Sequence, residues 1–340
     1  MLICLLAIAL AAPPGDIAYL ARANADDSQI HVINLESGAV RAVGLKGALD
    51  GPRWSPDGST LAYTVQTPDG SAIYVVDADG AGGRMLEHAA PDARGPVWSP
   101  DGARIAYTLG HGLDAQIAVF DLASDTETVW AGGGTSLANP IWISRRLAEI
   151  LLDPDLRASP FFEAGFGFDR NTRSLLLAVG WSGTPAQTST DLFVVSENTF
   201  TPVADGRMPS SGAYAELRPA ASETALAFDS NDGGDREVFV ISTRKTFDLS
   251  NHRAADWNPV WSPVAETLLI ESVRGGRSGI YHCVARRAGK IRTIAAFSDG
   301  DCWAPAWSAD GTWIAYVSDR ERDPAVYVVR EDGEDHARIS

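Results

Sequence analysis

Hydrophobic and polar positions along the chain repeat in one order, in which a short apolar run is followed by a polar turn and another short apolar run. Seven of these runs have the β-branched and aromatic composition of strands, as in "IYVVDA" and "VFVIST". They begin at Ile30, Ile73, Ile117, Leu192, Val238, Ile280 and Val326. The pattern predicts an all-β chain whose repeats each contribute the same set of strands.

A five-residue motif, Trp-Ser-Pro-Asp-Gly, marks the repeat. It stands at residues 54–58 and 98–102, and a variant with Ala in place of Pro stands at 307–311. Pro presets φ at the second position of a turn, Asp suits the third, and Gly tolerates the fourth. We expect the motif to join two strands and its Trp to fill space between adjacent sheets. Each of its residues then has a turn or packing role, so the motif indicates shape rather than activity.

The spacing of this Trp sets the period of the repeat. Trp54, Trp98 and Trp142 are 44 residues apart, and Trp261 and Trp307 are 46 apart. We expect Leu217, 44 residues before Trp261, to take the Trp position in its own repeat. A period near 44 is typical of a four-stranded propeller blade. The sequence therefore predicts a β-propeller of about seven four-stranded blades, or six if one copy is degenerate.

Two parts of the chain depart from this period. The first copy lacks a Trp-containing inner strand, so either blade 1 has three strands or residues 2–10 supply the fourth. The gap between Trp142 and Leu217 is 75 residues, which predicts an insertion at about 145–173. This insertion contains Phe161, Phe162, Phe166 and Phe168. These side chains could cover one end of the propeller, fill a partner site, or cap a widened blade, and part of the stretch could be ordinary strand.

The N-terminus predicts export. Residues 1–12 form a short apolar run that ends in small residues and is followed by Pro13 and Pro14, which resembles a secretory signal peptide without its usual basic start. The alternative is a buried strand. The run is too short to span a bilayer, and no other segment is longer. We expect residues 13–340 to form a single propeller domain in the periplasm or outside the cell.

Charge and cysteine content limit the partners. The net charge is −16, which repels phosphate backbones and anionic membrane surfaces, so we expect no nucleic-acid partner and a monomer without a transmembrane segment. After removal of a signal peptide, Cys283 and Cys302 would remain. In an exported protein they could pair, or they could be two buried thiols.

The repeats resemble those of the TolB-like β-propeller family, a WD40-like repeat. The resemblance rests on Trp-Ser-Pro-Asp-Gly followed by Ile-Ala-Tyr, and on the longer pattern at 225–242 and 314–329. It covers most of the chain after residue 15. The family includes TolB, which binds a peptidoglycan-associated lipoprotein, non-catalytic propellers attached to serine peptidases, and some carbohydrate-active lyases. The 340 residues leave no room for the extra domains of TolB or of the peptidases, so the resemblance implies the propeller alone.

Motifs for catalysis and cofactors are incomplete. Residues 180–185 lack the final Gly of a Gly-x-Ser-x-Gly elbow, and 131–136 lack the Lys of a phosphate loop. The six His have no local metal spacing. Acidic loops at 77–80 and 229–235 lack full calcium spacing, although calcium stays open for them. We therefore expect a protein that is not an enzyme, with no catalytic residues, no metal site and no cofactor.

The better functional signal lies in the loops that enter each inner strand, because they should ring one mouth of the central channel. Loops on rigid scaffolds often carry binding. The candidate binding residues are Asp50, Arg53, Asp92, Arg94, Asn139, Asp256, Trp257, Asn258, Asp301 and Trp303. We expect a non-catalytic scaffold that recognises a protein, peptide or glycan there. The alternatives are an oligosaccharide lyase or hydrolase with a site in the channel, and an accessory subunit of a separately encoded enzyme.

Overall fold

A computed structural model describes most of the chain and shows the predicted all-β propeller. The described residues are 8–10, 16–22, 27–34, 37–88, 91–131, 136–152, 175–184, 187–196, 199–203, 218–231, 235–242 and 246–339. They form seven antiparallel sheets of four strands, each made of consecutive strands. The prediction of about seven blades is therefore confirmed, and each of the seven predicted apolar runs is the third strand of its blade.

The strands of the first four blades follow one another without crossovers. Blade 1 contains β1 (Ile8–Leu10), β2 (Asp16–Arg22), β3 (Ser28–Asn34) and β4 (Val40–Val43). Blade 2 contains β5 (Arg53–Trp54), β6 (Thr60–Thr67), β7 (Gly70–Asp77) and β8 (Arg84–Met85). Blade 3 contains β9 (Ala93–Trp98), β10 (Arg104–Leu109), β11 (Gln116–Asp121) and β12 (Thr126–Ala131), with a 3₁₀ turn, η1 (Gly112–Asp114). Blade 4 contains β13 (Ser136–Ile143), β14 (Leu175–Thr184), β15 (Gln187–Ser196) and β16 (Thr199–Pro202), with α1 (Arg145–Leu152) after its first strand.

The last three blades repeat the same order. Blade 5 contains β17 (Ala220–Ala221), β18 (Ala225–Ser230), β19 (Glu237–Ser242) and β20 (Thr246–Asp248). Blade 6 contains β21 (Asp256–Trp261), β22 (Thr267–Ser272), β23 (Gly279–Val284) and β24 (Ile291–Ala295). Blade 7 contains β25 (Cys302–Trp307), β26 (Trp313–Ser318), β27 (Ala325–Arg330) and β28 (Ala337–Arg338).

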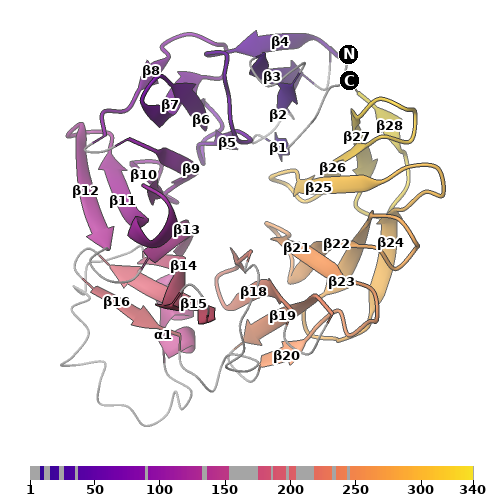
Figure 1. Ribbon diagram of the computed structural model, residues 1–340. Coiled ribbons are helices and arrows are strands. Elements are labelled where there is room, and N and C mark those ends of the chain that lie inside the picture. The colour runs from indigo at the N-terminus through magenta and orange to yellow at the C-terminus, as the bar shows by residue number, and fades with distance from the viewer. Residues whose placement is uncertain are drawn as a thin grey trace.

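The blades stand in chain order around a common axis, and blade 7 lies beside blade 1 (Figure 1). In blade 1 the innermost strand is β1, which pairs with β2 from Ile8↔Tyr19 to Leu10↔Ile17. Of the two predicted arrangements for blade 1, the structure therefore has the one in which N-terminal residues supply the inner strand. Cleavage of residues 1–12 stays a prediction.

The hydrophobic core is divided among the interfaces between blades. Each of seven buried clusters joins one blade to the next, including one between blade 7 and blade 1 that contains Ile17, Tyr19 and Val326. A sheet in this ring buries both faces against its neighbours, so apolar residues line both sides of the central strands. Stability of this fold depends on contact between consecutive blades rather than on a single centre.

The repeated motif forms the turn between the first and second strands of a blade, as predicted. In blade 2, Gly58 has a φ of 71° and its N–H donates to the Ser55 carbonyl at 2.9 Å. The Ser55 hydroxyl donates to Asp57 at 2.5 Å and accepts from the Thr60 N–H at 3.0 Å. The same bonds recur at 99–104 and 308–313, where Ala309 replaces Pro. The hydroxyl and the carboxylate therefore fix the turn.

The Trp of the motif ties each blade to the one before it. Its indole Nε1 donates to a main-chain carbonyl of the preceding inner strand, for example from Trp98 to Arg53 at 3.0 Å. The equivalent bonds run from Trp142 to Val97, from Trp261 to Ala220, and from Trp307 to Val260. The prediction that this Trp fills space between sheets is confirmed. The hydrogen bond also fixes the orientation of its indole toward the preceding blade.

The position that Trp takes in other blades is held by a different residue of blade 5 than expected. In blade 5, Ala221 pairs with Leu226 and follows the carbonyl that Trp261 reaches, so Ala221 takes the Trp position. The prediction of Leu217 for that position was wrong, because the turn after Ala221 is shorter than in other blades.

Of the predicted insertion at 145–173, the first part is α1, which buries Leu147 and Leu151 between blades 4 and 5. The four Phe lie outside the described residues.

Cys283 and Cys302 are both buried and both free. They belong to separate clusters, one between blades 5 and 6 and one between blades 6 and 7. Burial raises the pKa of the Cys283 thiol to about 12 and that of Cys302 to about 11, so both are protonated. Of the two alternatives for these residues, the structure has the buried thiols.

Within the described part of the chain, no helix is both long and apolar enough to cross a membrane.

Candidate functional site

Nine of the ten predicted binding residues lie at one end of the blades, whereas Arg53 lies toward the other end, directly before Trp54. We call the end with the nine residues the loop face: there the inner strands begin, and there hairpins join the second and third strands of each blade. The Trp-Ser-Pro-Asp-Gly turns lie at the opposite end, the turn face. Asp50, Asp92 and Asp301 lie in the loops before inner strands, and the other seven residues lie on those strands. These residues come from blades 2, 3, 4, 6 and 7, because each repeat places its inner strand at the same point of the blade.

A bulge shapes the start of four inner strands. The residue three positions before the Trp has positive φ in each: 64° at Gly95, 52° at Asn139, 53° at Asn258 and 51° at Ala304. A Pro follows each of these residues, and the pairing register shifts there. Positive φ is costly for residues other than Gly, and surrounding bonds must hold it.

The preceding blade supplies those bonds. The Gly95 N–H donates to both Asp50 Oδ2 and Thr64 Oγ1 at 3.1 Å. In blade 4, the Asn139 N–H donates to Thr108 Oγ1 at 3.0 Å. In blade 7, the Ala304 N–H donates to Glu271 Oε1 at 3.0 Å. The second strands of blades 2, 3 and 6 therefore each fix the inner strand of the next blade at the loop face.

The predicted residues of blades 2 and 3 are partly used in this framework. Asp50 also accepts from the Thr64 N–H at 2.7 Å, so its carboxylate organises the loop. Arg94 donates to the Gly110 carbonyl at 2.8 Å, and Asp92 lies 3.4 Å from His111 Nε2. Arg53 is exposed, and its Nη1 donates to the Pro52 carbonyl at 3.3 Å. Arg53 takes the position that Val97, Ile141, Val260 and Ala306 fill in other blades.

Glu271 organises the loop face between blades 6 and 7, and sequence reasoning missed it. Its Oε2 accepts from Trp257 Nε1 at 2.8 Å, and its Oε1 accepts from Asn258 Nδ2 at 2.6 Å and from the Ala304 N–H. Burial raises the pKa of Glu271, and these donors oppose that rise. The available signal was its position, since Glu271 stands where other repeats have Thr64 and Thr108.

Two Arg–Asp ion pairs lie beside this cluster. Arg274 Nη2 donates to both oxygens of Asp256 at 2.8 Å, and Arg236 pairs with Asp229. Both Asp side chains are fully buried, so Asp256, one of the predicted binding residues, does not reach solvent itself. A main-chain bond of 2.7 Å from the Asp256 N–H to the Arg236 carbonyl joins the two pairs across blades 5 and 6.

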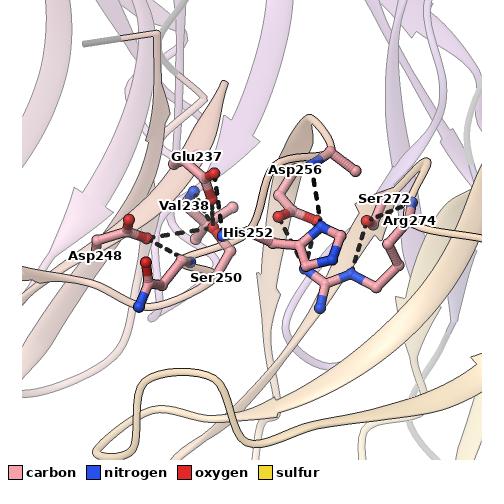
Figure 2. Close-up of polar contacts among 10 residues, drawn as sticks. Glu237, Val238, Asp248, Ser250, His252, Asp256, Ser272 and Arg274 are labelled. Atoms are coloured by element: carbon pink, nitrogen blue, oxygen red, sulfur yellow. Dashed lines mark hydrogen bonds and ion pairs between the residues drawn. The ribbon is translucent and has the colours of Figure 1, made fainter. Parts of the chain in front are cut away.

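A second set of carboxylates borders the same loop (Figure 2). Ser250 donates to Glu237, and the His252 N–H donates to the other Glu237 oxygen at 3.2 Å. Asp248 accepts from the Asn251 N–H at 2.8 Å. Burial is the largest influence on Glu237 and raises its pKa to about 7. Burial also raises the pKa of Asp248. Glu237 therefore carries less negative charge near neutral pH than an exposed carboxylate would.

Among the described residues, no group of three or more His, Cys, Asp and Glu side chains has an arrangement that could hold a metal ion. His31 packs against Tyr19, and His282 packs against Trp307. His88 is buried between blades 2 and 3, where its Nε2 accepts from the Ile73 N–H at 3.1 Å. These His side chains have packing or hydrogen-bonding roles.

Comparisons with known proteins agree with the fold. Residues 9–152 match the family described as TolB beta propeller domain. The β-propeller domain of the Trilobed protease from Pyrococcus furiosus is similar at 13% identity and a TM-score of 0.71, over 100% of this chain and 98% of that chain. TolB from Acinetobacter baumannii is similar at 12% identity and a TM-score of 0.53, over 93% of this chain and 77% of that chain.

An acylaminoacyl peptidase from Pyrococcus horikoshii is similar at 12% identity and a TM-score of 0.68, over 100% of this chain but 52% of the peptidase chain. This chain therefore spans about half the length of that enzyme. Likeness at such identity concerns the fold. The seven four-stranded blades and the repeated Trp-Ser-Pro-Asp-Gly turns agree with this match, and the chain is a seven-bladed β-propeller whose residues 9–152 match the TolB propeller family.

Proposed function

We propose that this chain is a non-catalytic, exported recognition scaffold that binds a protein or peptide through its loop face. The observation that carries the proposal is the fixed arrangement around Glu271. One buried carboxylate holds the indole of Trp257, the amide of Asn258 and the main chain of blade 7 at Ala304. Such bonds reduce the entropy that a partner would otherwise have to offset on binding.

The composition of the loop face supports recognition. Trp257 and Trp303 are half-buried near the beginning of their strands, and Arg94 is partly exposed at the beginning of its own. Trp and Arg are enriched among the residues that contribute most to protein–protein binding. The framework bonds of Asp50 and Arg94 hold the surrounding loops. The surface therefore combines rigid aromatic groups with accessible charge.

A pull-down from envelope extract tests the proposal. Arg94→Glu reverses a partly exposed charge on the loop face, and the side-chain bond that it removes, to the Gly110 carbonyl, lies within blade 3. The matched control is Arg286→Glu, which makes the same charge change on the turn face, where Arg286 pairs with Glu266. We expect the unmodified chain and the control to capture the same partner and Arg94→Glu to lose it. Equal capture by both variants would contradict recognition at the loop face, and capture of glycan alone would contradict a protein partner.

Export belongs to the same proposal, because an envelope partner requires it. The apolar residues 1–12 support a signal peptide, yet Ile8–Leu10 also form β1. We expect protein recovered from the periplasm to begin near Pro13 and blade 1 to keep β2, β3 and β4. Intact mass of the periplasmic protein measures this directly. A mass that includes residues 1–12 would contradict the signal peptide and keep β1 in place.

A further inference from the structure

The guanidinium of Arg274 is fixed on one side and open on the other. Its Nη2 donates to both oxygens of Asp256 at 2.8 Å, and its Nε donates to Ser272 Oγ at 2.9 Å (Figure 2). Its carbon Cζ lies 5.2 Å from the centre of the Tyr281 ring. Three hydrogen bonds and an aromatic contact therefore hold the group in a single orientation.

The remaining nitrogen, Nη1, points to no protein acceptor. Among the described residues, none accepts a hydrogen bond from Nη1, and the buried side-chain atoms without a partner are Arg292 Nη1 and Tyr327 Oη alone. Nη1 therefore reaches solvent, in agreement with the 15% exposure of the Arg274 side chain. A guanidinium has five N–H donors in a planar fork that matches carboxylate geometry, so an oriented and partly open one is suited to a second carboxylate.

The fold does not require a charge at this position. In the pairing register, Asp256 corresponds to Ala93 in blade 3, Leu137 in blade 4 and Cys302 in blade 7. A buried ion pair often contributes no more stability than apolar residues of similar size. Three other blades have an apolar side chain at the position of Asp256, so the packing there does not need an ion pair. The pair in blade 6 is therefore better explained by the orientation that it gives Arg274.

The surroundings favour an anion despite the net charge of −16. Arg236 lies next to this pair, with its own Asp229 fully buried and its side chain 25% exposed. Both ion pairs therefore present their cationic member to solvent and keep the carboxylate inside. The pKa of Glu237, raised by burial to about 7, reduces the competing negative charge near neutral pH.

We propose that Arg274, oriented by Asp256, binds a carboxylate group of an extended peptide at the loop face between blades 5 and 6. This inference rests on the proposed recognition function and names the chemistry of the partner. A peptide is favoured because the proposed function calls for a protein or peptide partner, and such a chain carries carboxylates at its C-terminus and on its Asp and Glu side chains. Trp257, directly after Asp256, supplies an aromatic surface beside the guanidinium site.

The test uses the whole chain and two probes, acetyl-Gly-Ala-Gly-Ala as the free acid and as its C-terminal amide, at constant ionic strength. Binding is followed by the shift of the Arg274 Nε–H resonance in NMR. We expect a saturable shift with the acid and binding at least tenfold weaker with the amide. The double variant Asp256→Asn/Arg274→Gln removes both charges together, so no unpaired buried charge is left, and it should lose the preference while melting close to the unmodified chain.

Arg277→Gln is the control, because Arg277 is half exposed on the same hairpin and lies 3.5 Å from Asp301. It should keep the preference for the acid. Equal binding of acid and amide, or an unchanged preference in the double variant, would overturn the carboxylate site. Binding of a galacturonate trisaccharide but neither peptide would overturn the peptide assignment. A partner captured by the double variant but lost by Arg94→Glu would leave the recognition function standing and refute this site alone.

Discussion

The indole of Trp98 in blade 3 donates a hydrogen bond of 3.0 Å to the carbonyl oxygen of Arg53 in blade 2. The bond joins the inner strands of two sheets that have no ladder hydrogen bonds between them. Because the same bond recurs from Trp142, Trp261 and Trp307, the ring contains a series of directional links between its blades. Loss of one link should weaken one interface and leave the others intact.

Trp98→Phe tests the strength of that link. The substitution removes the donor and part of the packed ring, and we expect it to lower the free energy of unfolding by about 1–2 kcal/mol. The control is Trp313→Phe, because the indole nitrogen of Trp313 has no partner among the described residues and its contact with Arg330 survives in Phe. Urea unfolding measures both. Equal losses in the two variants would show that the hydrogen bond contributes nothing beyond ring size.

The Ser–Asp pair of each turn predicts sensitivity to acid. The Ser hydroxyls, followed by nearby main-chain N–H groups, lower the pKa of Asp57, Asp101 and Asp310 below the ordinary value. A lowered pKa in the folded state gives stability above the unfolded pKa of about 3.9, and this stability is lost as pH falls through the folded value. We expect the melting temperature to fall more steeply below pH 4 in the unmodified chain than in Asp57→Asn/Asp101→Asn.

The matched control for this prediction is Asp69→Asn, an exposed hairpin carboxylate with no Ser hydroxyl donor among the described residues. Its acid slope should follow that of the unmodified chain. If the double variant keeps the full slope, the turn carboxylates are not the groups that protonate on acid unfolding.

Much of the framework could be predicted from the sequence, because it depends on local chemistry. The turn residues at 54–58 and the apolar third strands carry their own signals. The Trp position of blade 5 could not be found by counting, since Ala221 has no ring and its turn is shorter. The ten predicted binding residues lie on inner strands or in the loops before them, and their role in binding stays a prediction. Their bonds were not predictable, because Glu271 and Arg274 meet Ala304 and Asp256 through contacts between strands or blades that no local pattern encodes.

Glu237 predicts the opposite dependence on pH. Burial raises its pKa to about 7, so the folded state favours the protonated group. Its contribution to stability is complete below the unfolded pKa of about 4.3 and is lost as pH rises through 7. We expect the free energy of unfolding to fall by an amount on the order of 2 kcal/mol between pH 5 and pH 8 because of this group. Glu237→Gln, which keeps the acceptor for the His252 N–H, should reduce the fall, whereas Glu87→Gln, at an exposed position, should not.

Glu271 gives the last prediction, because all its known contacts are donors. Trp257, Asn258 and the Ala304 N–H each donate to its carboxylate, so the amide nitrogen of Glu271→Gln would face a donor whichever way it turned. A buried donor without an acceptor costs more than a lost neutral bond, and we expect a loss of about 2–3 kcal/mol. Thr108→Val removes the equivalent single bond to the Asn139 N–H and should cost about 1 kcal/mol. Urea unfolding of both variants ranks the two positions. A smaller loss in Glu271→Gln than in Thr108→Val would mean that Glu271 does not hold the loop face, and the rigid arrangement proposed for recognition would lose its principal support.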